Sequence, residues 1–457
     1  MITETQAPEH YLEAFDQFNH RAATQLGWLK TLRQEGFARF AEAGFPTRHD
    51  EDWRFTNVAP ISSREFQPAP AASIEAQQLA RLGLSGFEYQ LVFVNGRFSR
   101  ELSQIESLPP GVRICGLAEE LGTNASAVKE HLGQYLNFRR DAFAALNTAF
   151  LEDGAYVCVP RGTVLEEPLY VLFISVPGEA AIMEHPRSLI VVEENSQATI
   201  VEDYISLGPS TAPSFSNTVT ELVAAQNAVV SHYMIVRQGD SSFNVSTLRI
   251  QQARTSNVAT HSLLLSGALV RNNVHPVLAG EGAECLINGL FMANGRQHMD
   301  NYMLVEHASP HCNSRQFYNG ILNGQGHGVF HGRIIVHKDA QKTDAKQTNR
   351  NLLLSDDAQI DTKPQLEIYA DDVKCTHGAT IGQVEENALF YLRSRGLDES
   401  SARHLLLLAF ANECLDRMHS EQVRNHLKRL VMEWLPESGK HAGEKPAEIE
   451  RAWEEVG

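Results

Sequence analysis

The sequence predicts a mainly β protein, with a β-solenoid core and an α-helical region on either side of it. From Ala155 onward, short apolar strands recur between turns that are rich in Gly, Asn and Asp. Few helical segments lie between these strands, which argues against a sheet built from βαβ units. On both flanks the apolar residues recur at three- and four-residue spacings, which is the period of an amphipathic helix.

The composition narrows the class of protein. The chain has 457 residues, of which 43% are hydrophobic and 21% are charged, so we expect a globular protein of more than one domain. The formal net charge is -17 at pH 7. Nonspecific binding to nucleic acid or to an anionic membrane requires a basic surface, so neither is an expected partner.

The cysteines and the N-terminal residues predict a cytoplasmic protein. The six cysteines are scattered without CxxC spacing, which is typical of free thiols in a reducing compartment. The first residues show neither the basic nor the apolar segment of a signal peptide. No stretch approaches the roughly 18 consecutive apolar residues of a transmembrane helix.

Residues 1–150 are predicted to form a mostly helical N-terminal region. Apolar residues recur at helical spacing over 9–43, and a further helix is expected within 124–150. The polar segment 45–58 is expected to wrap the surface and to fix itself there with its aromatic rings. Asn95-Gly96 stands between alternating apolar residues, which is a strong signal for a β-hairpin.

Repeated turn signatures support the solenoid. GEGAECLINGLF at 280–291 is similar to GQGHGVFHGRII at 324–335, and KDAQ at 338–341 is similar to DDAQ at 356–359. Irregular repeats of a strand and a tight turn favour a solenoid in which each coil buries its apolar face on the next. A β-sandwich is the competing interpretation of this pattern.

After Gln383 the helical period returns. Two amphipathic helices are expected beyond a first one that ends at a Gly396 cap, and Ser420 is a suitable N-cap for the last of them. The final residues, 436–457, are polar, and AEIERAWEEV at 447–456 has a pattern that allows a short helix.

Cys375 and His377 are the first candidates for ligands of a metal ion. If Lys374 to His377 is extended, both side chains lie on one face of the strand. A thiolate beside an imidazole suits iron, zinc, copper or a nascent iron–sulfur unit. A metal site needs three or four ligands, and this segment supplies two, which suggests a site completed by another subunit. The plainer alternative is a buried thiol and a hydrogen-bonded core histidine.

Other histidines fit a metal site less well. His327 and His331 are four residues apart, which on a strand is about 13 Å and too far for one ion. Ring stacking and turn hydrogen bonds are the expected roles. His311 and Cys312 are adjacent, so on a strand they would face opposite ways.

The acidic residues near the end of the core lie in predicted turns, where Asp side chains hydrogen-bond to nearby backbone amides. They are Asp356, Asp357, Asp371 and Asp372. A carbohydrate-active β-helix hydrolase or lyase would instead need such acids clustered on one coil. That enzyme is the alternative function, and a purely structural solenoid is a third. Turnover of polysaccharide would separate the enzyme from a scaffold.

The run RNLLLSDDAQIDTKPQLEIYADDVKCTHGATIGQ at 350–383 resembles the C-terminal core of the SufB/SufD family, which forms the SUF scaffold for iron–sulfur cluster assembly. The CTHGATIGQ ending is similar to the SufD branch and differs from the CEHEAT-type ending of SufB. The CxxCxxC-type motif that SufB often carries in its N-terminal region does not occur here. The resemblance extends over nearly the whole chain and is most specific over 350–383.

The resemblance implies a right-handed parallel β-helix over about 151–383, between helical regions at 1–150 and 384–457. It implies a non-catalytic scaffold subunit that pairs with SufB through the β-helix and recruits the SufC ATPase through its C-terminal helices. A homodimer is a further possibility for the isolated subunit. No Walker A sequence occurs in the chain, so we expect no ATP to be bound by this chain itself.

The resemblance also implies a role in iron acquisition and cluster assembly. The family histidine at the position of His377 is implicated at the interface with SufB, where it faces a SufB cysteine. We therefore expect His377, and after it Cys375, to be ligands of iron or of a nascent iron–sulfur cluster shared transiently with SufB.

Overall fold

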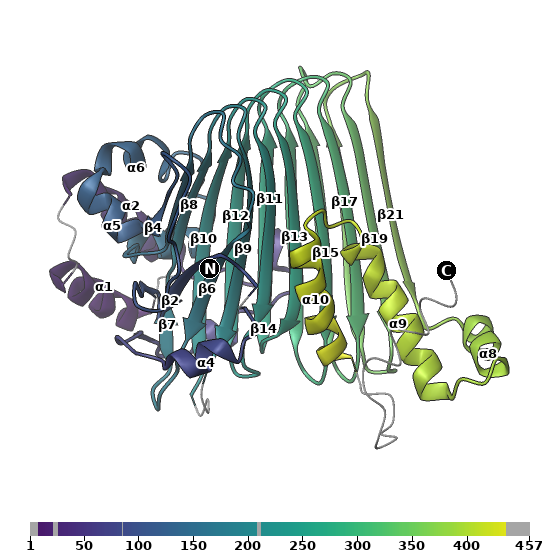
Figure 1. The fold of residues 1–457 in the computed structure, drawn as a ribbon. Helices are drawn as coiled ribbons and strands as arrows, with labels where there is room; N and C mark the ends of the chain where they lie inside the picture. The colour runs from purple at the N-terminus through teal and green to yellow at the C-terminus, as the bar shows by residue number, and fades with distance from the viewer. Residues whose placement is uncertain (1–7, 22–25, 85, 208–211, 436–457) are drawn as a thin grey trace.

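The computed structural model describes residues 8–21, 26–84, 86–207 and 212–435, and a β-solenoid runs through its centre (Figure 1). Two sheets face each other across the interior, and successive core strands alternate between them. Within each sheet the core strands from β5 onward are parallel, and neighbours are separated by 27 residues at Asn257/Glu284 and by 31 at Tyr318/Asn349. The predicted β-helix core with flanking helices is therefore confirmed, and the β-sandwich interpretation is wrong.

The larger sheet, sheet A, has 11 strands among the described residues. They are β1 (Gln67–Pro68), β4 (Arg113–Gly116), β5 (Ala155–Val159), β7 (Ile182–Glu184), β8 (Arg187–Val192), β10 (Ser214–Ala224), β12 (Phe243–Gln252), β14 (Leu269–Leu278), β16 (His298–His307), β18 (His327–Val336) and β20 (Gln359–Ile368).

The other sheet, sheet B, has 10 strands within the same described ranges. They are β2 (Tyr89–Val94), β3 (Arg97–Phe98), β6 (Leu169–Ser175), β9 (Gln197–Ser206), β11 (Val229–Arg237), β13 (Asn257–Ser266), β15 (Glu284–Ala293), β17 (Asn313–Leu322), β19 (Asp344–Leu353) and β21 (Lys374–Gly382).

Helices lie before and after the solenoid. They are α1 (Glu9–Arg21), α2 (Gly27–Ala43), the 3-10 turn η1 (Glu51–Trp53), α3 (Ala59–Ser62), α4 (Ala76–Ala80), α5 (Leu117–Thr123), α6 (Ala125–His131), α7 (Ala142–Ala149), α8 (Glu386–Ser394), α9 (Glu399–Leu415) and α10 (Glu421–Trp434). None of these helices is long and apolar enough to cross a membrane.

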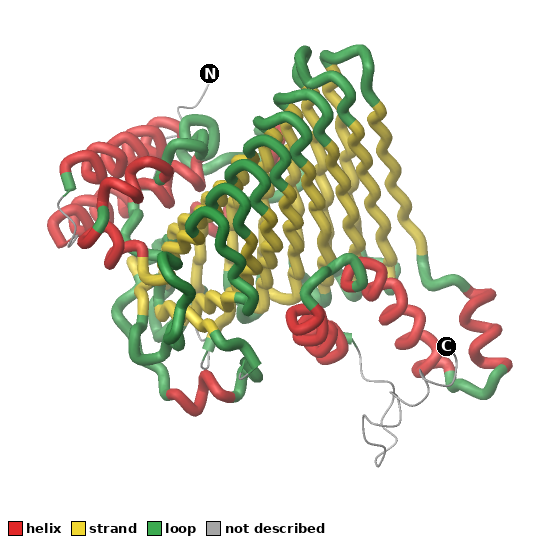
Figure 2. The backbone as a smooth tube through the Cα atoms, turned by 45° about the horizontal axis from the view of Figure 1, so that its top comes forward, coloured by secondary structure: helices red, strands yellow, loops and turns green. Residues whose placement is uncertain are grey.

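The predicted turn repeats lie at both corners of the solenoid, because the turn at 280–283 precedes β15 of sheet B and the turn at 324–326 precedes β18 of sheet A. At the corner before the sheet B strands β9 to β19, each coil places one residue at positive φ, and its backbone N–H donates to the carbonyl that precedes the equivalent residue of the next coil. These residues are Asn195, Asn227, Thr255, Gly282, His311 and Lys342. Asn and Gly tolerate this conformation best, which is why they recur in the turns. Figure 2 shows these stacked turns as green loops at the edge of the yellow strands.

The predicted N-terminal hairpin is confirmed, and it extends the solenoid. Asn95 and Gly96 have φ of 49° and 74°, and they join β2 to the antiparallel β3. β2 then pairs in parallel with β6, and β4 pairs with β5, so strands from within 1–150 lengthen both sheets. The following residues Phe98, Ile105 and Leu108 pack against the interior core.

The N-terminal helices cover the outer face of sheet A. Phe40 of α2 and Phe143 of α7 belong to one buried cluster with Phe215 of β10. The segment predicted to wrap the surface does so, because the Arg271 guanidinium lies 3.8 Å from the centre of the Trp53 ring. Farther along the sheet, Glu51 forms an ion pair with Lys363 of β20.

The C-terminal helices α9 and α10 lie across the outer face of sheet B (Figure 1). Asn319 and Asn288 donate from Nδ2 to the carbonyls of Phe410 and Cys414, each over 2.9 Å, which fixes α9 to β17 and β15. The predicted cap at Ser420 is confirmed, since its side chain accepts a hydrogen bond from the Val423 N–H. The predicted short helix at 447–456 lies outside the described residues.

Candidate functional site at the open end of the solenoid

Cys375 and His377 lie on β21, the last strand of sheet B. The alternation of the strand puts both side chains on the face toward the solenoid interior, and Cys375 packs against the interior core. Cys375 is half-buried, whereas His377 is exposed. No further coil follows β21 among the described residues, so they leave this strand uncovered at the end of the solenoid.

The thiol of Cys375 is held in its neutral form. Burial raises its pKa, and the nearby Asp344 carboxylate raises it further, while a hydrogen bond from the Ala345 backbone acts in the opposite direction. A thiolate is the form that binds a metal, so metal binding here has to displace a proton. The free thiol on its own is a weak ligand.

A glutamine lies directly behind the histidine. Gln347 on β19 is the register partner of His377, and it is buried. Its Nε2 lies 3.4 Å from the carbonyl oxygen of Gly332, and its Oε1 has no hydrogen-bond partner among the described residues. A Cβ at Gly332 would stand 2.1 Å from the amide, so only glycine leaves room for it. Sequence reasoning missed Gln347, although it shares the inward face of β19 with Ala345.

The described part of this chain supplies only two ligands at this end. Within the described ranges, no group of three or more His, Cys, Asp or Glu side chains is arranged to hold a metal ion. None of the side-chain hydrogen bonds among the described residues uses the His377 ring, so its nitrogens remain available. A site of three or four ligands here would need a second chain.

The histidines four residues apart on β18 are engaged with other side chains. His327 Nε2 lies 2.8 Å from Asp361 Oδ2, and its Nδ1 lies 3.1 Å from Nδ1 of His298. The His331 ring meets the Tyr302 ring edge-on, and its Nε2 bonds to a glutamine on β20. The predicted ring contacts are confirmed, but the hydrogen bonds run between strands and not within turns.

His311 and Cys312 do not lie on a strand as assumed. They belong to the turn before β17, where His311 has φ of 60°. The Cys312 thiol is buried and donates to the carbonyl of Gly280 over 3.3 Å. This pair is therefore part of the corner of the solenoid.

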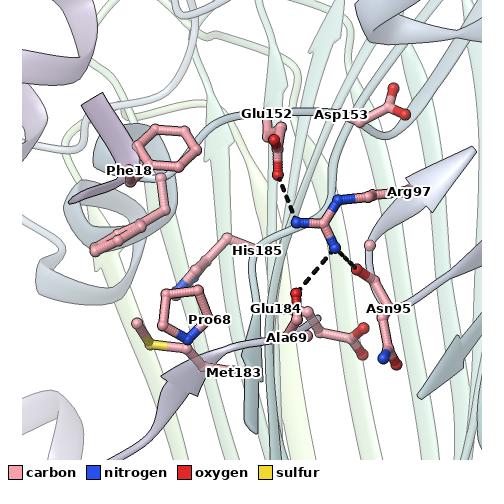
Figure 3. A pocket seen from close by; sticks show the side chains of 12 residues that line it. Phe18, Pro68, Ala69, Asn95, Arg97, Glu152, Asp153, Met183, Glu184 and His185 are labelled. Carbon is pink, nitrogen blue, oxygen red and sulfur yellow. Dashed lines mark hydrogen bonds and ion pairs between the residues drawn. The ribbon is translucent and has the colours of Figure 1, made fainter. Parts of the chain in front are cut away.

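A small polar cavity lies at the N-terminal end, near β3 and β7 (Figure 3). Its volume is about 30 Å³, which is room for roughly two water molecules. Arg97 is already bonded to Glu152 and to the Ala69 carbonyl, and burial lowers the pKa of His185 to about 3. This cavity is too small for an organic substrate.

The aspartates that a β-helix hydrolase would need for catalysis lie in turns, as predicted. Asp356 and Asp357 are in the turn before β20, and Asp371 and Asp372 are in the turn before β21. Asp372 forms an ion pair with Lys342 of the preceding coil. These carboxylates shape turns at different positions and do not form an acid–base pair on one strand.

A groove lies beside the open end, between β21 and helices α8 and α9. Its volume is about 440 Å³, and its polar lining includes Arg350, which pairs with Glu413. Its apolar side chains come from β19, β21, the link between β21 and α8, and the two helices, and they are Leu352, Ile381, Val384, Ala388, Leu406, Ala409 and Phe410. We call this feature the α8–α9 groove.

Comparison with known proteins assigns the family. Residues 174–410 match the family model described as "SUF system FeS cluster assembly, SufBD core domain", and residues 5–171 match "SufBD protein N-terminal region". The chain belongs to the SufB/SufD family. The resemblance found over 350–383 therefore extends along the chain, and the family is one of iron–sulfur cluster assembly proteins.

Curated relatives from bacteria agree with this family. The chain is 35% identical over 431 residues to an iron–sulfur cluster assembly SufBD family protein of Synechocystis, covering 92% of this chain and 94% of the relative. It is 31% identical to the iron–sulfur cluster assembly protein SufD of Escherichia coli, covering 93% and 97%. It is 24% identical to SufD of Bacillus subtilis, covering 94% and 98%.

Proposed function

We propose that this chain is a non-catalytic scaffold subunit that pairs with a SufB-type subunit through the open end of its solenoid. The observation that carries the proposal is the exposure of β20 and β21. Along β21 only Cys375 is partly buried, and no residue of β20 is fully buried. Each strand has one neighbour in its sheet among the described residues, so its other edge is free to pair.

An uncovered edge of this length favours a partner. Strands of nine and ten residues with free N–H and C=O groups tend to pair with other chains unless something covers them. Large apolar side chains stand at this end, since Tyr369 is 63% exposed and Ile381 is 51% exposed. A second solenoid end would supply both backbone partners and apolar contacts. In the absence of a SufB-type partner, the same surface favours pairing between two copies of this chain.

We place the iron or the nascent iron–sulfur cluster, as cargo, at this interface. His377 would donate a ring nitrogen, and Cys375 would donate its sulfur once its proton is displaced. A cysteine or histidine from the SufB-type subunit would complete the ligand set. A shared site of this kind forms only when the two subunits meet, which couples assembly of the complex to loading of the cargo.

We assign recruitment of a SufC-type ATPase to the C-terminal helices. Phe390 and Tyr391 on α8 are 75% and 56% exposed, which is unusual for adjacent aromatic side chains on a helix of nine residues. Exposed aromatic residues of this kind are typical anchors of protein–protein interfaces. The scattered free thiols and the acidic charge suit a cytoplasmic complex.

The experiment is co-purification with the SufB-type and SufC-type proteins of the same organism, followed by anaerobic cluster loading. Wild type, His377→Ala and the control His20→Ala are compared by bound iron and by absorbance. His20 is exposed on α1, in the N-terminal helical region and away from β20 and β21. We expect all three to assemble and only His377→Ala to lose iron.

Two results would contradict the proposal. Normal iron loading by an assembled His377→Ala complex would remove the histidine from the site. Failure of the wild type to bind either partner would remove the scaffold function itself. Loss of ATPase binding in a Phe390→Ala, Tyr391→Ala double variant that still binds the SufB-type subunit would support the separate assignment of α8.

A further inference from the structure

The α8–α9 groove has the lining of a site for an amphipathic helix. Leu406 and Ala409 of α9 form one side of it, and Ile381 of β21 lies on the other. Ala409 is exposed and Leu406 is only partly buried, although α9 buries the next two leucines, Leu407 and Leu408, against sheet B. A helix that lays apolar side chains into such a groove is a common mode of peptide recognition.

The chain carries a segment that fits this groove. Residues 447–456, AEIERAWEEV, lie beyond the described residues, and their sequence places Ile449, Trp453 and Val456 at positions i, i+4 and i+7. These positions share one face of a helix. The aromatic side chain of Trp453 is of the type that most often anchors such interfaces.

The linking residues are long enough to reach the groove. The described chain ends just after Trp434, whose indole N–H donates to the Leu265 carbonyl at the end of β13. From β13 to β21 there are four strand steps in sheet B, or about 19 Å. Residues 436–446 span at most about 36 Å when extended, which exceeds this distance.

Arginine side chains also lie beside the groove. The segment 447–456 contains four glutamates and one arginine. On the α8–α9 hairpin, Arg393 and Arg403 both pair with the single carboxylate of Glu399. Arg395 of the same hairpin lies over the Tyr391 ring, 5.2 Å from its centre, and forms no ion pair among the described residues. Arg395 therefore offers the acidic segment a cationic partner beside the groove, whereas Glu385 of the groove lining is acidic, so the apolar lining and the length of the linker carry the argument.

We propose that residues 447–456 bind as an amphipathic helix in the α8–α9 groove of their own chain, with Trp453 as the anchor. Bound there, the segment covers part of the surface on α8 and α9. Insofar as it regulates partner binding, the inference rests on the proposed recruitment of an ATPase by these helices. The segment would then compete with the ATPase for this surface.

The test uses the full-length chain and its Ile449→Asp, Trp453→Asp double variant. A fluorescently labelled peptide of residues 440–457 is titrated with each protein, and binding is followed by anisotropy. We expect saturable binding to the double variant and at least tenfold weaker binding to the wild type, whose own segment occupies the groove at high effective concentration. Peptide that binds neither protein, or both equally, would overturn the proposal.

Two matched controls locate the site. Ala409→Glu in the double-variant background adds a like charge and bulk to the groove, and should weaken peptide binding at least tenfold. Ala409→Ser is the conservative control and should bind as before. Equal binding by the Glu and Ser variants would place the peptide elsewhere. A concentration-dependent dimer that the double variant loses would show exchange between chains and overturn the assignment to one chain.

The regulatory part is measured separately with the SufC-type ATPase. Under the proposal the ATPase binds the double variant more tightly than the wild type. Equal affinity would contradict competition while leaving the peptide result intact. If the ATPase binds neither protein, the proposed function fails, and the anisotropy titration still decides whether the segment binds the groove.

Discussion

The first and last strands of sheet B show how differently the two ends of the solenoid are finished. Five of the six residues of β2 are buried, whereas no residue of β21 is. The N-terminal end is closed by Phe98, Ile105 and Leu108, which pack on the interior core. At the C-terminal end, the part of the chain that the structure describes places no further coil against the inward-facing Cys375 and His377.

This difference indicates that the two ends of the solenoid have different roles, one in stability and the other in binding. An end that is covered by its own chain contributes to stability, and changes there should lower the free energy of unfolding. An end that is left open contributes little to stability, and changes there should alter binding. Matched residues at the two ends should therefore differ in whether a substitution lowers stability or binding.

The largest effect is expected at the closed end, where Arg187 and Glu221 form an ion pair with both side chains fully buried. Glu221 also accepts the backbone N–H of Gly133, so it joins the N-terminal region to β10. Glu221→Ala leaves a buried guanidinium unpaired and should lower the free energy of unfolding by about 3–5 kcal/mol. Urea denaturation measures this change.

The control for that change is the exposed ion pair at the open end. Lys342→Ala removes the partner of Asp372, and both side chains are more than half exposed. Exposed pairs contribute little, so no measurable loss of stability is expected. Comparable losses at both ends would contradict the distinction between a closed and an open end.

A pair of isoleucines gives the next contrast. Ile287 on β15 is fully buried in the interior core, and Ile381 on β21 is half exposed. Ile287→Ala should cost about 2–5 kcal/mol because it leaves a cavity. Ile381→Ala should cost far less and should instead weaken binding of the SufB-type partner. A normal affinity for that partner would show that Ile381 lies outside the interface.

The pH dependence of stability should come from histidines that are buried within the fold, and not from exposed histidines at the open end. Burial lowers the pKa of His261 to about 3 and that of His307 to about 4, from an ordinary value of 6.5. Below pH 6.5 the unfolded state therefore binds more protons, and stability is lost as the pH falls toward 4. Each histidine contributes a loss of up to about 2 kcal/mol between pH 7 and pH 5.

Thermal unfolding at pH 7 and pH 5 measures this loss. The variant His307→Gln should reduce the difference between the two melting temperatures, because it removes one buried titrating ring. The exposed His377→Gln should leave the difference unchanged. An equal reduction by both variants would mean that acid sensitivity does not depend on burial.

Local patterns in the sequence predicted much of the fold. Asn95-Gly96 gave the hairpin, Ser420 gave a helix cap, and strand alternation put Cys375 and His377 on one face, because each of these depends on neighbouring residues. The repeated turns were visible because Gly, Asn and Asp recur where the chain turns between strands, at both corners of the solenoid.

Features that depend on distant residues were not predicted. The pairing of β2 with β6 and the position of Gln347 behind His377 follow from register between coils about 30 residues apart, which no local pattern encodes. The α8–α9 groove likewise depends on how the returning helix packs on sheet B. Alternation indicated the face of His377, but it did not indicate that no coil would cover that face.

The most direct test of the open end is hydrogen–deuterium exchange of the chain with and without its SufB-type partner. The free edges of β20 and β21 should exchange rapidly in the isolated chain and become protected over residues 359–382 in the complex. Amides of β2 and β5 at the closed end should not change. Protection confined to the closed end, or none over 359–382, would contradict the account.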